Sequence, residues 1–128
     1  MFCVMMTMQT MKKILIIEND PFMLKLYQEY LKQQSVDFDF ATDGRQGLEQ
    51  VATYQPDLIV LDMEMPNLNG LEALQILKDR GCQVPVVIVS NFENPEWIEK
   101  SKILGAKEYL IKSTFTPEAL TAKVVSFL

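Results

Sequence analysis

Short apolar runs alternate with amphipathic stretches along most of the chain. Continuous apolar runs of strand length lie at residues 13–17, 58–61 and 85–89, and polar residues follow each of them. Residues 37–41 alternate between polar and apolar side chains, which indicates an edge or half-buried strand, and a short run lies at 109–111. Because continuous apolar strands are typical of parallel sheets covered on both faces, the pattern predicts a buried parallel sheet.

Apolar residues at helical spacing follow every predicted strand, and those of the first helix include Phe22, Tyr27 and Leu31. The expected helices cover residues 21–31, 44–54, 71–80, 95–104 and 117–128. Asp20, Asn94 and Thr116 each precede a proline, as helix N-caps do, and Gly81 and Gly105 end the third and fourth helices. Repeated strand–helix units with right-handed crossovers imply an α/β fold, a doubly wound five-stranded parallel sheet with helices on both faces.

The amino-acid composition argues against several classes of function. The 128 residues form one domain, and the net charge of −5 with 12 scattered Lys and Arg argues against direct nucleic-acid binding. The chain has no His, and Cys3 and Cys82 have no metal-ligand spacing, which fits a reducing cytoplasmic location. The apolar N-terminus lacks a basic leader and is too short to span a membrane, so we expect no membrane association.

The division of the chain follows from the first strand. Residues 12–128 are predicted to be the domain, and residues 1–11 a tail that precedes it. An upstream start, an expression remnant and a disordered segment are all consistent with the composition of that tail.

Polar side chains stand where four of the predicted strands end. Glu18 and Asn19 follow the first strand, Asp62 the third, Ser90 the fourth and Lys112 the fifth. Each alone is consistent with a turn preference, and Asp62 alone is equally consistent with a capping role. Because ligands of open parallel sheets bind outside the carboxyl ends of the strands, the convergence of all five predicts a functional site.

The residue types indicate which chemistry this site can perform. Carboxylates with an amide oxygen suit a hard cation such as Mg²⁺, which also implies a phosphate-type substrate. An aspartate can attack phosphorus when a cation and a lysine offset the charge on the phosphoryl oxygens. We therefore expect Asp62 to be the nucleophile, Lys112 to stabilise charge, and Ser90 to donate a hydrogen bond to the phosphoryl group.

Four short stretches of the sequence resemble the motifs of a known protein family. They are Ile-Leu-Ile-Ile-Glu-Asn-Asp-Pro at 14–21, Asp62 followed by Met65-Pro66 and Gly70, Ser90, and Gly-Ala-Lys-Glu-Tyr-Leu-Ile-Lys at 105–112. Over about residues 12–128 the chain resembles the receiver domain of a two-component response regulator, of the chemotaxis-regulator-like single-domain kind. The resemblance implies a flavodoxin-like sheet.

The resemblance also assigns roles. It implies that Asp62 accepts a phosphoryl group from a sensor histidine kinase or histidine phosphotransfer protein. It implies that Mg²⁺ is held by Glu18, Asn19, Asp62 and the backbone carbonyl of Glu64. Lys112 is then the lysine that contacts the phosphoryl group, Ser90 the switch hydroxyl and Tyr109 the switch aromatic. The domain would be a signalling protein and not an enzyme beyond its own Mg²⁺-dependent phosphorylation and dephosphorylation.

The resemblance implies that such a domain transmits its signal by contact with another protein. It places this contact surface on the face made by residues 95–104, 109–111 and 117–128, where a downstream effector would bind. The same face is a candidate for homodimerisation. Inward movement of Ser90 is expected to let Tyr109 move from an exposed to a buried position.

The sequence departs from the family pattern at three positions. Asn19 replaces the second acid, Asn91 stands where a small residue commonly follows the hydroxyl, and Ser113 replaces a proline after Lys112. The first change keeps open a pseudo-receiver that binds partners but is phosphorylated weakly or not at all. An aspartate-nucleophile phosphatase is disfavoured because Glu64 stands where its second Asp is needed. A trans peptide is expected between Lys112 and Ser113, since a cis bond there costs about 3 kcal/mol.

Overall fold

The computed structural model describes residues 11–128, so residues 1–10 of the predicted tail lie outside the described residues. Strands and helices alternate as predicted. Their order is β1 (Lys13–Ile17), α2 (Pro21–Leu31), β2 (Asp37–Ala41), α3 (Gly44–Tyr54), β3 (Leu58–Asp62), α4 (Gly70–Asp79), β4 (Val86–Ser90), α5 (Pro95–Ile103), β5 (Glu108–Ile111), the 3-10 turn η1 (Lys112–Thr114) and α6 (Pro117–Val125). The α/β fold class is confirmed.

The strands form one five-stranded parallel sheet in the order β2-β1-β3-β4-β5. β3 lies at the centre, with Val60 in register with Ile16 of β1 and with Val87 of β4. Since all strands run in the same direction, their carboxyl ends lie at one edge of the sheet. β2 is an edge strand, as its alternating pattern predicted.

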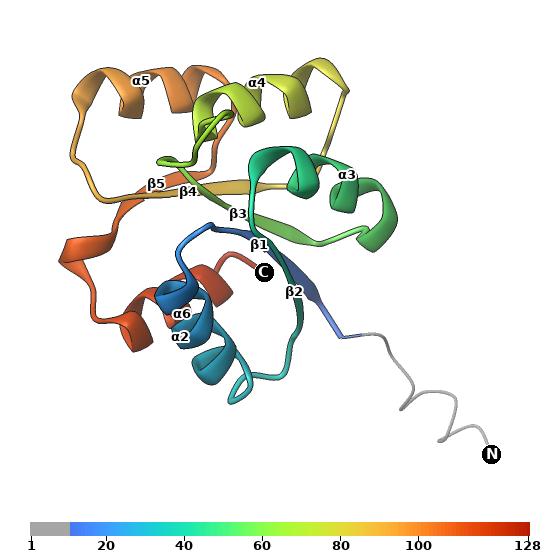
Figure 1. Ribbon diagram of the computed structural model, residues 1–128, viewed down its shortest axis with the longest axis vertical. Coiled ribbons are helices and arrows are strands. Elements are labelled where there is room, and N and C mark those ends of the chain that lie inside the picture. The colour runs from blue at the N-terminus through green and yellow to red at the C-terminus, as the bar shows by residue number, and fades with distance from the viewer. Residues whose placement is uncertain (1–10) are drawn as a thin grey trace.

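Helices cover both faces of the sheet (Figure 1). α2 and α6 pack together on one face, whereas α3, α4 and α5 follow one another on the opposite face. The burial of β3 and β4 along their whole length follows from this arrangement. The result is the doubly wound architecture that the sequence predicted.

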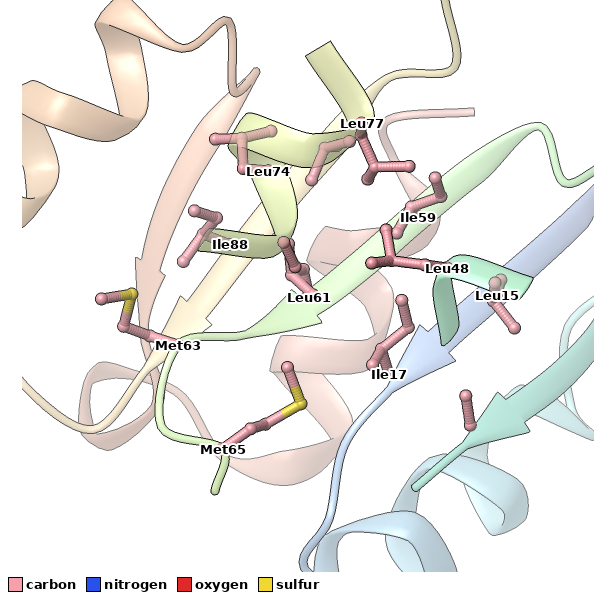
Figure 2. Close-up of a cluster of buried hydrophobic side chains, with 13 residues drawn as sticks. Leu15, Ile17, Leu48, Ile59, Leu61, Met63, Met65, Leu74, Leu77 and Ile88 are labelled. Atoms are coloured by element: carbon pink, nitrogen blue, oxygen red, sulfur yellow. The ribbon is translucent and has the colours of Figure 1, made fainter. Parts of the chain in front are cut away.

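The face below α3 and α4 holds the larger hydrophobic cluster (Figure 2). Leu48 of α3 and Leu74 and Leu77 of α4 point towards buried strand side chains, among them Ile59 and Ile88. Side chains at alternate strand positions point to this face, because successive residues of a strand project to opposite sides.

The other face is filled from α2 and α6. Tyr27 and Leu31 of α2 and Leu120 and Val124 of α6 are buried there against the intervening strand residues, Ile16 among them. Burying both faces of the sheet holds the central strands in place, and with them the residues at their carboxyl ends.

Most helix boundaries agree with their sequence signals. The side chain of Asp20 accepts a hydrogen bond from the Phe22 amide at 3.0 Å, and Asn94 and Thr116 also cap their helices. Gly81 and Gly105 have φ angles of +72° and +92°, a conformation that glycine adopts without steric cost, beyond the ends of α4 and α5.

Two expectations were wrong in detail. Phe22 was counted with the apolar positions of α2 but is 69% exposed, because it lies nine residues before the buried Leu31, which at 100° per residue places it on the opposite side of the helix. The last helix was expected to reach Leu128, but α6 ends at Val125. The Lys112–Ser113 peptide is trans, as predicted, since no cis bond occurs in the part of the chain that the structure describes.

None of the helices formed by residues 11–128 combines the length and the apolar character needed to span a bilayer.

Candidate functional site

The carboxyl ends of β1 and β3 bring two acids into the interior. Asp62 is the last residue of β3 and is 3% exposed, and Glu18 follows β1 and is 2% exposed. The backbone fixes both positions, because the Glu18 amide donates to the Ala41 carbonyl and the Met63 amide to the Val89 carbonyl, each at 2.9 Å. Hydrogen bonds to the neighbouring strands therefore fix the backbone from which both carboxylates project.

Lys112 connects these two acids. Its Nζ donates to Glu18 Oε1 at 2.8 Å and lies 3.4 Å from Asp62 Oδ1. Lys112 opens the 3-10 turn after β5, so three strands contribute to a contact between residues that are far apart in the sequence. The predicted meeting of Glu18, Asp62 and Lys112 at one edge of the sheet is therefore present in the structure.

One lysine does not balance two buried acids. Burial raises the pKa of Asp62 to about 8, and the hydrogen bond and negative charge of Glu18 add to this, while Lys112 acts in the opposite direction. Burial lowers the pKa of Lys112, but its hydrogen bond to Glu18 and the charge of Asp62 outweigh this and raise the pKa overall. The site has a deficit of positive charge, which is the condition that a bound cation relieves.

Ser90 is fully buried at the end of β4, and its hydroxyl contacts a residue of the loop between β3 and α4. Ser90 Oγ donates to Glu64 Oε2 at 2.5 Å, and the Asn91 amide donates to Glu64 Oε1 at 2.7 Å. The sequence had assigned Glu64 only a backbone role, and the role of its carboxylate was missed. Its position two residues after Asp62, at the edge of the sheet where β4 also ends, was the available signal.

Tyr109 is linked to the same loop. It is half-buried on β5, and its hydroxyl donates to the Phe92 carbonyl at 2.9 Å, while the Phe92 amide donates to Ser90 Oγ at 3.1 Å. Burial and the charge of Glu64 raise the pKa of Tyr109, and its interaction with Ser90 lowers it. The two predicted switch residues are thus joined through one residue of the β4–α5 loop.

Asn19 is the predicted site residue that lies outside these contacts. It is exposed beside Glu18, and no hydrogen bond or ion pair joins its side chain to the Glu18–Asp62–Lys112 group in the described structure. Within residues 11–128 no three acidic, His or Cys side chains are arranged as a metal-binding group. A cation here would rely on two carboxylates together with neutral oxygens.

Comparison with protein families decides the assignment. The model of the response regulator receiver domain matches residues 14–125. The chain belongs to the response regulator receiver family. This match, the sheet order and the position of Asp62 at the end of the central strand agree with the resemblance that the motifs carried.

Curated relatives are longer response regulators. The Regulator of RpoS of Escherichia coli is 35% identical over 101 residues, which cover 79% of this chain and 30% of that protein. The Alkaline phosphatase synthesis transcriptional regulatory protein PhoP of Bacillus subtilis is 31% identical over 121 residues, covering 91% of this chain and 48% of that protein. The chain thus spans 30% and 48% of the length of these two relatives, less than half of each.

Solved structures give the same fold. The receiver domain of the Francisella response regulator 1452 superposes with a TM-score of 0.80 at 28% identity, covering 90% of this chain and 94% of that one. The chemotaxis protein CheY4 of Vibrio cholerae reaches 0.83 at 24% identity, covering 93% and 100%. The second likeness supports the fold alone.

Proposed function

We propose that this receiver domain takes a phosphoryl group onto Asp62 and signals by protein contact. The observation that carries the proposal is the buried contact of Lys112 with Asp62 and Glu18, at 3.4 and 2.8 Å. A nucleophilic carboxylate beside a lysine and a second acid is the group that phosphoryl transfer to aspartate requires. Family membership supports the same reading.

The proposed transfer begins with an Asp62 carboxylate oxygen attacking phosphorus. An O–P bond forms as the bond to the donor breaks, and the leaving histidine nitrogen of the donor takes up a proton. Lys112 already lies 3.4 Å from Asp62 Oδ1, so its ammonium can balance charge on the phosphoryl oxygens with a small movement. Ser90 would then donate to the phosphoryl group, which orders its loop.

The donor set fits Mg²⁺. Glu18 and Asp62 supply two carboxylates, and the Glu64 carbonyl lies on the loop that follows Asp62. Burial and the neighbouring Glu18 raise the pKa of Asp62 to about 8, and a bound cation would act against this shift. When bound, Mg²⁺ supplies charge that offsets the phosphoryl oxygens. Asn19 can add an amide oxygen, but it carries no charge, so we expect weaker Mg²⁺ binding than at a site with a third acid.

We further propose a sensor histidine kinase or histidine phosphotransfer protein as the donor and a cytoplasmic location. The effector face would consist of α5, β5 and α6, with homodimerisation on that face as the alternative. The half-buried Tyr109 lies within this face and is linked to Ser90 through Phe92, which supports output there.

Asn19 favours a second candidate function. A pseudo-receiver would keep the fold and the partner surface but take up little or no phosphoryl group, and the two-acid donor set supports this reading. Glu64 also favours it, because its carboxylate occupies the Ser90 hydroxyl. The contact of Lys112 with Asp62 opposes it.

Intact-mass spectrometry after incubation with acetyl phosphate and Mg²⁺ separates these readings. We expect one phosphoryl adduct on the parent chain, none on Asp62→Asn, and an unchanged adduct on Asp79→Asn, which alters an exposed aspartate of α4. An unmodified parent at saturating Mg²⁺ would establish the pseudo-receiver. An adduct that persists in Asp62→Asn would reject Asp62 as the acceptor.

A further inference from the structure

The Glu64 carboxylate uses both of its oxygens to hold the β4–α5 loop. Oε2 accepts from Ser90 Oγ at 2.5 Å, and Oε1 accepts from the Asn91 amide at 2.7 Å. Ser90 is fully buried, so water does not compete for its hydroxyl. Hydrogen bonds to an ionised acceptor are about twice as strong as neutral ones, which makes this a firm connection between two loops at the phosphoacceptor edge.

The contact with Glu64 uses the capacity of the Ser90 hydroxyl to donate a hydrogen bond. A serine hydroxyl has one proton to donate, and here that proton is directed to Glu64. The Phe92 amide donates to the same oxygen at 3.1 Å. Ser90 therefore cannot donate to a phosphoryl group on Asp62 while the Glu64 contact is intact.

We infer that Glu64 is an internal anion that competes with the phosphoryl group for Ser90 and holds the unphosphorylated conformation of the loop. The inference rests on the proposed phosphorylation of Asp62. A phosphoryl group adds about −1.5 to −2 charge beside the Glu64 carboxylate and offers Ser90 stronger acceptor oxygens. Repulsion of Glu64 by the phosphoryl group and competition for the Ser90 hydroxyl both break the Ser90–Glu64 hydrogen bond. The Glu64 carboxylate then moves away as Ser90 turns towards Asp62.

Glu64 is a positioning residue in this scheme, and it sets the threshold for activation. Without its carboxylate, Ser90 would be available before the phosphoryl group arrives. The affinity for a phosphoryl group should then rise by about tenfold, the factor expected for one charge-assisted hydrogen bond that need not be broken. This gain in affinity should disappear when the Ser90 hydroxyl is removed, because Glu64 and the phosphoryl group then have no hydroxyl to compete for.

Beryllofluoride, a non-covalent phosphoryl analogue, measures this competition by calorimetry at saturating Mg²⁺. We expect Glu64→Ala to bind it about tenfold more tightly than the parent, whereas Ser90→Ala and the Glu64→Ala, Ser90→Ala double variant bind it equally. Glu93→Ala is the matched control, because it removes a carboxylate from an exposed position of the β4–α5 loop, the loop that Glu64 contacts. If Glu64→Ala keeps its gain in the Ser90→Ala background, general charge removal explains the gain and the proposal is wrong.

Amide exchange of Asn91 tests the hold on the loop without any ligand. We expect Asn91 to be protected in the parent and in Glu93→Ala, and to exchange at least tenfold faster in Glu64→Ala. Equal exchange in the parent and Glu64→Ala would overturn the proposal. If the proposed phosphorylation of Asp62 is wrong, the result differs: beryllofluoride binds neither the parent nor any variant. That result would also reject the proposed competition for Ser90.

Discussion

Replacing Asp62 by asparagine should stabilise the metal-free protein. The parent must bury a carboxyl group whose neighbours are Glu18 and a single lysine, and its pKa is raised from an ordinary 3.8 to about 8. The unfolded chain therefore releases this proton near pH 4, whereas the folded chain holds it until about pH 8. Over that window the folded state binds more protons, so the free energy of unfolding falls as the pH rises.

The size of the effect follows from the pKa. Each unit corresponds to about 1.36 kcal/mol, so at pH 7 the burden on folding reaches about 4 kcal/mol as an upper bound. The Asp62→Asn variant would not carry this burden, and because the pKa of about 8 already includes the attraction of Lys112, we expect a gain of up to about 4 kcal/mol. Between pH 5 and pH 7 the advantage of Asp62→Asn should grow by about 3 kcal/mol and then level off above pH 8.

Urea unfolding with a chelator present, at pH 5 and pH 7, measures both quantities. Asp79→Asn is the control, since a change at that exposed site should alter the free energy of unfolding by no more than about 0.5 kcal/mol. Mg²⁺ should then stabilise the parent more than Asp62→Asn. The reasoning is refuted if Asp62→Asn is no more stable than the parent at pH 7, or if its advantage is the same at both pH values.

Three further changes test other parts of the site. Asn19→Asp should tighten Mg²⁺ binding measured by calorimetry, and equal affinities would show that the amide costs nothing. Gly70→Ala should lower the free energy of unfolding in urea by about 1 to 3 kcal/mol, because a Cβ there would lie 2.8 Å from a backbone oxygen at the end of β3; an unchanged midpoint contradicts this. Ser90→Ala should remove the response of the Tyr109 ring resonances to beryllofluoride, and a response like that of the parent would break the link between the two residues.

Asp62 and its neighbours were predictable because parallel strands restrict where their ends can lie. Once the apolar runs define strands of a single sheet, Glu18, Asp62 and Lys112 must share one edge, and the structure brings both acids within 3.4 Å of the Lys112 ammonium. Helix starts were equally accessible, since caps such as Asp20 act on amides within the next turn. Both predictions rest on local or topological constraints.

The role of the Glu64 side chain depends on information of another kind. It lies in the loop between β3 and α4, and its partners Ser90 and Asn91 lie 26 and 27 residues away. Apolar periodicity does not determine the path of such a loop or the direction of its side chains. Phe22 was misjudged for a different reason: its apolar character was counted, although its position in the helical repeat places it opposite the buried Leu31.

The rigidity of the sheet limits where a signal can travel from Asp62. β3 is hydrogen-bonded to β1 and β4, and the Met63 amide is bonded to Val89 at 2.9 Å, so the acceptor itself has little freedom to move. The β4–α5 loop is held from two sides by side chains, through Glu64 on one side and through the Tyr109 hydroxyl on Phe92 on the other. Charge placed on Asp62 acts on the first of these contacts directly. Since Phe92 also donates to Ser90, a shift of Ser90 moves the acceptor of Tyr109, and we infer that the change reaches β5 and the proposed effector face by this route.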